Sequence, residues 1–251
     1  SEVDTVTGST GTADSVALLD ATTNVIAVSA VESVVATNSA SADTVTMLSA
    51  GALSVSGIDN VIGTTASTDS LRLITAGDDV SVSAIDTVIG TGAGGADVVT
   101  MLADNTLSVS ALDSVIGSGG NDAVRMMGGG TLHVDLIDTV IGGTSTTDVV
   151  HLTSTTSLSV SNVETVQGTT DTTDAVRMLS AGTLATSAVD SVTGTSGNAD
   201  ILQLAGSDGG AVSVSAIETV RGSAATDSVT LLASGGIAVS AVETVIGTSG
   251  A

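Results

Sequence analysis

One short phrase recurs along almost the entire chain, and this periodicity constrains the fold more than any other feature. It reads VSVSAIDTVIG at residues 80–90, LSVSALDSVIG at 107–117 and AVSVSAIETVRG at 211–222. Successive acids in the pattern [VIL]-[DE]-[TSN]-V are 25 to 28 residues apart, which predicts a structural unit of about 26 to 27 residues. We call these ten acids the first acidic column: Asp4, Glu32, Asp59, Asp86, Asp113, Asp138, Glu164, Asp190, Glu218 and Glu243.

Each unit reads as three short β-strands separated by turns. In the third strand of one unit, Leu107 and Val109 alternate with Ser108 and Ser110, the period of two that a half-buried strand shows. Val, Ile and Thr are abundant, as they are in strands generally, and no helical period of 3.6 competes. The three strands expected in this unit are DTVIG at 86–90, DVVTML at 97–102 and LSVSAL at 107–112.

A unit this short cannot bury its own apolar face, so successive units must cover one another. We therefore predict an all-β fold, a parallel β-solenoid of about nine to ten coils with about 26–27 residues, three short strands and three faces per coil. Residues 1–251 would form a single continuous solenoid domain. The sequence has no Phe, Tyr, Trp or Pro, which suits a thin aliphatic core and strands that need every backbone N–H.

Charge narrows the range of partners. The formal net charge is −23, and the four basic residues are all Arg. Such a chain cannot neutralise many phosphates, so we expect no nucleic-acid partner and no attraction to anionic membrane surfaces. No apolar run approaches the ~20 residues that a transmembrane helix needs, so direct membrane insertion is not expected.

A second set of acids follows the Gly/Ser/Thr-rich loop of each unit, and every member is Asp. In the first acidic column Asp and Glu interchange, which predicts an outward, solvated corner, whereas the invariant length in the second set predicts a defined contact. The side chain could cap its own corner by accepting backbone N–H bonds, or it could bind Ca²⁺ together with corner carbonyls. These strict aspartates, the candidate calcium ligands, are Asp14, Asp43, Asp69, Asp97, Asp122, Asp148, Asp174, Asp200 and Asp227.

The stretches GTGAGGADVV at 90–99 and GTSGNADIL at 194–202 are similar to the Gly-rich, Asp-bearing nonapeptide of RTX proteins, G-G-x-G-x-D-x-U-x. The whole chain also resembles the Val/Thr/Gly/Asp repeat regions of large bacterial surface proteins, including RTX-type adhesins and surface-layer proteins. On this resemblance, the motif aspartate corresponds to Asp97, Asp200 and their seven equivalents. The family implies type I export, calcium-dependent folding outside the cell and a structural or adhesive role.

Other recurrent positions predict surface features. Arg72, Arg125 and Arg177 each lie three residues after a strict aspartate and would stand ~10 Å apart on one outward face, either relieving local charge or docking another rod. His133 and His151 interrupt two different positions of the repeat and read as exposed substitutions rather than ligands. Hydroxyl residues form two further columns, one beginning Thr5, Ser33, Asn60, Thr87 and the other Ser29, Ser56, Ser83, Ser110.

These patterns favour a scaffold over an enzyme, because no unit gathers the unlike groups that catalysis needs. We expect an extracellular structural repeat protein of a bacterial surface layer, sheath, filament or adhesin stalk. The alternative is an adhesive module whose Thr/Ser/Asp ladders bind carbohydrate or ice. Neither end of this sequence shows a polar cap, which predicts either a longer array or head-to-tail stacking; lateral self-association and surface glycans are further expectations.

Overall fold

The computed structural model describes residues 4–11, 13–19, 22–37, 42–66, 68–92, 94–154, 157–170, 173–197, 199–206 and 210–248. The uncapped ends and parts of the two RTX-like stretches (Ala93 and Asn198) therefore lie outside the described residues. The chain divides into two compact units, Ser1–Arg125 and Met126–Ala251, and each is treated by itself below.

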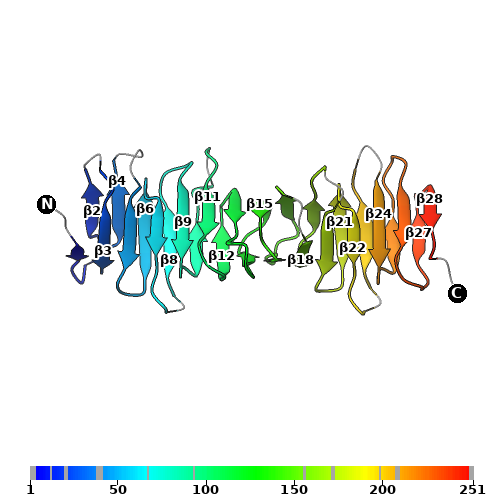
Figure 1. Ribbon diagram of the computed structural model, residues 1–251, viewed down its shortest axis with the longest axis horizontal. Coiled ribbons are helices and arrows are strands. Elements are labelled where there is room, and N and C mark those ends of the chain that lie inside the picture. The colour runs from blue at the N-terminus through cyan, green and yellow to red at the C-terminus, as the bar shows by residue number, and fades with distance from the viewer. Residues whose placement is uncertain are drawn as a thin grey trace. The chain divides into compact units, whose positions relative to one another are not determined.

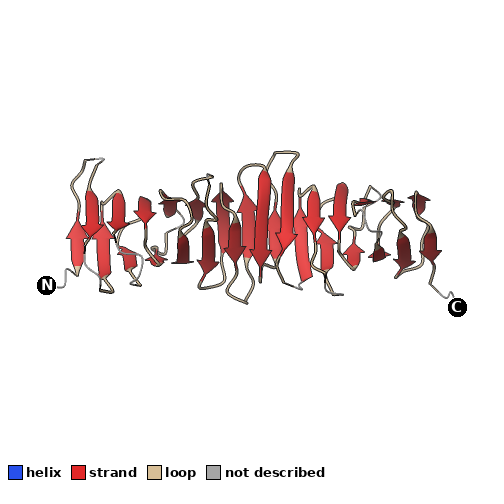
Figure 2. Ribbon diagram, turned by 90° about the horizontal axis from the view of Figure 1, so that it is seen from above, coloured by secondary structure: helices blue, strands red, loops and turns tan. Residues whose placement is uncertain are grey.

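In both units, odd-numbered and even-numbered strands form separate sheets, so the chain changes sheet after every strand (Figures 1 and 2). The odd sheet of the first unit contains β1 (Thr5–Thr7), β3 (Val25–Ser29), β5 (Thr44–Met47), β7 (Asn60–Ile62), β9 (Asp79–Ser83), β11 (Val98–Met101) and β13 (Ser114–Ile116). Its even sheet contains β2 (Ser15–Leu18), β4 (Ser33–Ala36), β6 (Ala52–Ser56), β8 (Ser70–Leu73), β10 (Thr87–Ile89) and β12 (Thr106–Ser110), and β14 (Ala123–Met126) spans the boundary between the units.

The second unit repeats this arrangement. Its odd sheet contains β15 (Gly130–Asp135), β17 (Asp148–Leu152), β19 (Thr165–Gln167), β21 (Thr183–Ser187), β23 (Ile201–Leu204), β25 (Thr219–Arg221) and β27 (Ala238–Ser240). Its even sheet contains β16 (Thr139–Ile141), β18 (Ser157–Ser161), β20 (Ala175–Met178), β22 (Ser191–Thr193), β24 (Ala211–Ser215), β26 (Ser228–Leu231) and β28 (Thr244–Ile246).

The fold is thus the expected parallel β-solenoid, but each coil has two strands and two faces rather than three. Register partners show the shorter coil, because Val98 pairs with Ser114 and His133 pairs with His151, both closer in sequence than one repeat. A repeat of three strands therefore covers one and a half coils, and the coils outnumber the nine to ten expected. Because a repeat has three strands, consecutive repeats begin on opposite sheets. Equivalent strands of every second repeat lie on the same sheet, three strands or ~14 Å apart.

The core lies between the two sheets and is built from aliphatic rows. Leu53, Leu71, Val88 and Val109 are consecutive register partners across β6, β8, β10 and β12, and all four are buried. A row therefore places unlike strands of the repeat side by side, rather than copies of one strand. This works because Val, Leu, Ile and Met occupy the inward positions of all three strand types and pack against one another without a specific partner.

Each turn after a third strand brings two backbones into close contact. Ala84, Ala111 and their equivalents adopt the left-handed conformation, with φ of 54° and 55° at these two residues. The neighbouring glycine packs directly against the carbonyl of this turn: a Cβ added to Gly63 would lie 2.0 Å from the oxygen of Ala84, and one added to Gly90 would lie 2.1 Å from that of Ala111. In these copies the G of the DTVIG motif has no room for a Cβ beside the facing carbonyl. Where the repeat carries Ala36 at this position instead, the facing turn has Gly57.

We predict that Gly90→Ala destabilises the first unit by ~1–3 kcal/mol, because the new methyl group must displace the carbonyl of Ala111. Urea unfolding followed by circular dichroism measures the change. Gly128→Ala, in the second unit, is the control, since a Cβ there has no neighbour within 4 Å. Equal effects of the two substitutions would contradict the close-contact explanation.

Candidate functional site at the coil corners

The nine strict aspartates open the second strand of each repeat and are divided between the two sheets. Asp69 precedes β8 of the even sheet, whereas Asp97 precedes β11 of the odd sheet. Members on one sheet are three strands, ~14 Å, apart, so the strict aspartates do not form a single column of stacked carboxylates. Eight of the side chains are buried nonetheless: Asp43, Asp69, Asp97, Asp122, Asp148, Asp174, Asp200 and Asp227.

The carboxylate of Asp97 illustrates how one buried acid links three coils. Its Oδ2 accepts hydrogen bonds from the backbone N–H and the hydroxyl of Thr91, at 2.7 and 2.8 Å. Its Oδ1 accepts the N–H of Gly77 in the preceding coil, at 2.8 Å. Its own N–H donates to Oδ2 of Asp113 in the following coil, at 2.9 Å. We call this set of contacts the aspartate staple.

The staple recurs with the same chemistry in both units. In seven copies the Ser or Thr at the start of the loop donates its hydroxyl to the strict aspartate, as Thr64 does to Asp69 and Thr195 to Asp200, both at 2.7 Å. These hydroxyl residues were not expected as partners from the sequence. The signal was present as a recurrent Gly-[Ser/Thr] pair four to six residues before the aspartate.

The first acidic column belongs to the same network. Asp86 accepts the N–H of Asp69 at 2.9 Å, and its own N–H donates back to the carbonyl of Asp69 at 3.0 Å. Glu32 does the same for Asp14, with its Oε2 accepting at 2.8 Å. These side chains are half-exposed or exposed, so either length reaches the same N–H from the corner. The interchange of Asp and Glu is explained by this reach, although the carboxylates are hydrogen-bonded rather than merely solvated.

Asp148 has the most incomplete set of partners among the stapling aspartates. Gly143 takes the place of the usual Ser or Thr and donates only its N–H, at 2.7 Å, while Oδ1 is buried without a hydrogen bond. Burial therefore raises the pKa of Asp148 above 3.8, the Gly143 N–H opposes this, and Glu164 adds repulsion. Asp200 Oδ1 is also buried without a hydrogen bond, but the Thr195 hydroxyl supports its other oxygen.

These contacts support the capping role of the strict aspartates, since the carboxylate oxygens accept N–H and O–H groups of the chain itself. Within the described ranges, no group of three or more His, Asp or Glu side chains is arranged so that it could hold a metal ion. Calcium binding at the nine aspartates stays a prediction. At copies such as Asp97, an ion would have to share oxygens that already accept hydrogen bonds.

The outward rows mix residues from the three strand types. On the even sheet, Ser33, Ser54, Arg72 and Ile89 are consecutive register partners, so the hydroxyl residues do not form uninterrupted columns. Arg72 and Arg125 lie on β8 and β14 of this sheet, three strands and ~14 Å apart rather than the ~10 Å expected. Both differences follow from the coil of two strands.

The coil of two strands also places the two histidines of the chain side by side. His133 on β15 and His151 on β17 are direct register partners, and their ring centroids are 4.8 Å apart in an edge-to-face arrangement. If each coil were one whole repeat of three strands, His133 in a third strand and His151 in a second strand would lie on different faces of the solenoid. Their separation in the sequence equals one coil of two strands, which is why the pair was not expected from the repeat length.

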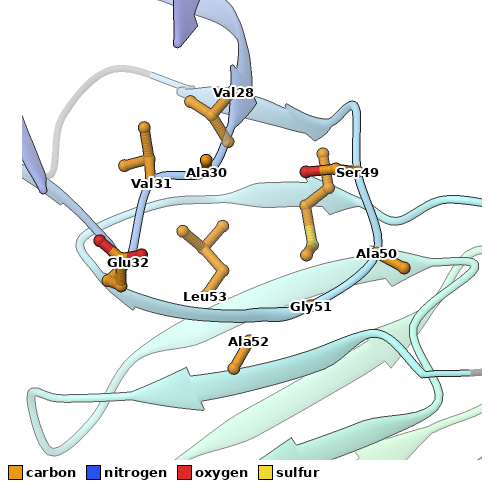
Figure 3. Close-up of a pocket in the computed structure, with 10 residues that line it drawn as sticks. Val28, Ala30, Val31, Glu32, Ser49, Ala50, Gly51, Ala52 and Leu53 are labelled. Carbon is orange, nitrogen blue, oxygen red and sulfur yellow. The ribbon is translucent and has the colours of Figure 1, made fainter. Parts of the chain in front are cut away.

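Small pockets open between the turns of neighbouring coils. In the first unit, a pocket of about 160 Å³ lies between the turn that carries Ala30 and Val31 and the turn at residues 49–51, with Leu53 between them (Figure 3). The second unit has an equivalent pocket of about 160 Å³ beside Asn162 and Gly182. Both are lined mainly by small and aliphatic residues, so they are packing defects of the corner rather than clusters of reactive groups.

Comparison of the chain with protein-family models, curated proteins and solved structures gives no match. The described residues contain no helix long and apolar enough to cross a membrane. The role proposed below therefore rests on the residues and contacts described above.

We predict that Asp97→Asn lowers the free energy of unfolding by ~1–3 kcal/mol, because an amide NH₂ then faces backbone donors that the carboxylate accepted. Asp79→Asn is the control, as this carboxylate is exposed on the same sheet. Chemical unfolding at pH 7 compares the two. A loss that is no greater for Asp97→Asn than for Asp79→Asn would contradict the staple.

Gly143→Ser is predicted to stabilise the second unit by ~0.5–1.5 kcal/mol at pH 7 by supplying the missing hydroxyl donor to Asp148. A Cβ at this position would lie 3.2 Å from the nearest atom, the carbonyl oxygen of Met126, so a small side chain needs only a slight adjustment.

The effect has a defined pH dependence. The raised pKa of Asp148 means that the contribution of this group to wild-type stability decreases as pH rises from about 3.8, because Asp148 ionises there in the unfolded chain while it retains its proton in the folded one. The serine hydroxyl favours the ionised form, so this decrease should be smaller in Gly143→Ser. Unfolding curves between pH 3 and 7 measure it, and identical pH profiles would refute the explanation.

Proposed function

We propose that this chain is an extracellular structural repeat protein, a part of a bacterial surface layer, sheath, filament or adhesin stalk. The observation that carries the proposal is the staple, which recurs in both units and joins neighbouring coils by short-range contacts, in full in copies such as Asp97. A solenoid of this kind can be lengthened by adding repeats without changing its fold. The net charge of −23 would keep such rods soluble and would make their association sensitive to cations.

β27 and β28, the last strands that the structure describes, have inward positions that a further coil would cover (Figure 1). Val239 and Val245 occupy inward positions, in register with the fully buried Val220 and Val229. Yet each of the two outer valines is 43% exposed. Another coil, either from the same polypeptide or from a second copy, would cover these side chains and pair the two free strand edges.

Exposed aliphatic side chains offer a second means of association, from the sides of the coils. They occupy the position directly after the second strand of most repeats, so exposed apolar side chains recur along the coils. Contacts between such corners would add to end-to-end stacking in a layer or bundle. The residues are Leu19, Leu48, Ile74, Leu102, Met127, Leu179 and Leu232.

Val245→Asp is predicted to reduce end-to-end association, because it places a charge at one of these inward positions. Ile246→Asp is the matched control on the same strand: Ile246 pairs with the half-buried outward Thr230, so its side chain lies on the opposite face of β28. Sedimentation velocity over a range of concentrations should show larger species for wild type and Ile246→Asp than for Val245→Asp, and electron microscopy should show filaments or sheets of the wild type.

A wild-type chain that stays monomeric at high concentration with added divalent cations would refute the scaffold proposal. Calcium is tested in the same samples by circular dichroism after removal of metal with a chelator. If Ca²⁺ binds the strict aspartates, thermal stability should rise with added Ca²⁺ and the rise should shrink in Asp97→Asn. An unchanged melting curve would remove calcium from the proposal and leave the scaffold intact.

A further inference from the structure

The two histidines form the one feature of the described surface that combines strong ligand groups with a defined geometry. His133 and His151 are the only histidines in the chain, and each replaces a different residue type of the repeat. They meet because β15 and β17 are neighbouring parallel strands and the two residues are direct partners in register. We propose that this histidine pair is a binding site for a divalent transition-metal ion of the Zn²⁺, Ni²⁺ and Cu²⁺ class.

The geometry suits chelation by two imidazoles. The side chains leave the same outward face of the odd sheet, and the ring centroids are 4.8 Å apart at an interplanar angle of 76°. Two nitrogens bound to one tetrahedral zinc ion are ~3.3 Å apart, given zinc–nitrogen bonds of about 2.0–2.1 Å. Rotation of the rings about their side-chain bonds can bring one nitrogen of each ring to this separation without moving the backbone, because β15 and β17 hold the two residues side by side in register.

The surroundings favour an incoming cation. His133 is exposed and His151 is half-buried, so the pair is open to solvent on one side. The pKa of His151 lies below 6.5, first because of burial and then because of repulsion from His133. The imidazole is therefore neutral at pH 7, which is the form that binds metal. Gln167, the next partner in the row, and solvent water can occupy remaining coordination positions.

The choice of metal separates this site from the acidic corners. Imidazole nitrogen binds zinc, nickel and copper in preference to the hard ions Ca²⁺ and Mg²⁺, whose ligands are oxygens. The proposal is independent of the scaffold role, since it needs only β15 and β17 in register. A metal held here would add a selective cation site to a surface that otherwise attracts cations through its overall negative charge.

The test uses the complete chain, freed of metal, and isothermal titration with Ni²⁺ at pH 7. His133→Ser and His151→Thr install residues that other repeats carry at these positions. The matched control is the double variant His151→Thr/Gln203→His, which keeps two histidines on exposed positions of the same sheet but places them four strands, ~19 Å, apart. We expect one Ni²⁺ per wild-type chain and a loss of affinity of about tenfold or more in all three variants, because bidentate binding is lost.

A second readout does not depend on the variants' stability. In NMR titration of the wild type with Zn²⁺, the ring resonances of both histidines should shift together and saturate at one ion per chain, and Ca²⁺ at the same concentration should leave them in place. The proposal fails if the relocated pair binds Ni²⁺ as tightly as the wild type, since the acidic surface would then be the ligand. It also fails if only one imidazole responds to Zn²⁺.

Discussion

Backbone hydrogen bonding at the corners is the constraint on which this solenoid depends. Within each sheet, parallel strands pair along their whole length, but the loops between them leave N–H groups without partners in the ladder. A buried polar group without a hydrogen bond costs more than the bond itself contributes, so the corners need acceptors at fixed positions. The strict aspartates supply them, with one oxygen for their own loop and, in copies such as Asp97, the other for the preceding coil.

This arrangement explains why a strongly acidic chain can bury carboxylates between its coils. Buried acids such as Asp69 and Asp97 accept several N–H or O–H groups, and hydrogen bonds to a charged acceptor are stronger than neutral ones. Repulsion between the strict aspartates is limited because the half-coil offset places them three strands apart on each sheet. Asp148 shows the consequence when donors are missing: desolvation is no longer offset, and the proton is held more tightly.

The strands, their parallel stacking and the aliphatic rows could be predicted from the sequence, because residues such as Leu107 and Val109 carry the period of two directly. The number of strands per coil could not, since a repeat of this length is compatible with one coil of three strands or with one and a half coils of two. That choice depends on how the sheets pack across the core, which is a tertiary property. It determines where the strict aspartates lie and whether His133 meets His151. The left-handed φ of Ala111 was equally invisible, since alanine rarely adopts it without external constraint.

A repeat of one and a half coils has a further consequence for how the surface is built. All three strand types occur in both sheets, so the two faces of each unit display the same kinds of residues, offset by one repeat. Insertion or loss of one repeat would exchange the faces of every later strand and still bury the same inward positions. Features that depend on a pair of unlike strands, as the histidines do, arise where substitutions in two register-paired strands meet, here one in a third strand and one in the following second strand. Such a chain can therefore vary its surface locally while the staples keep the coils unchanged.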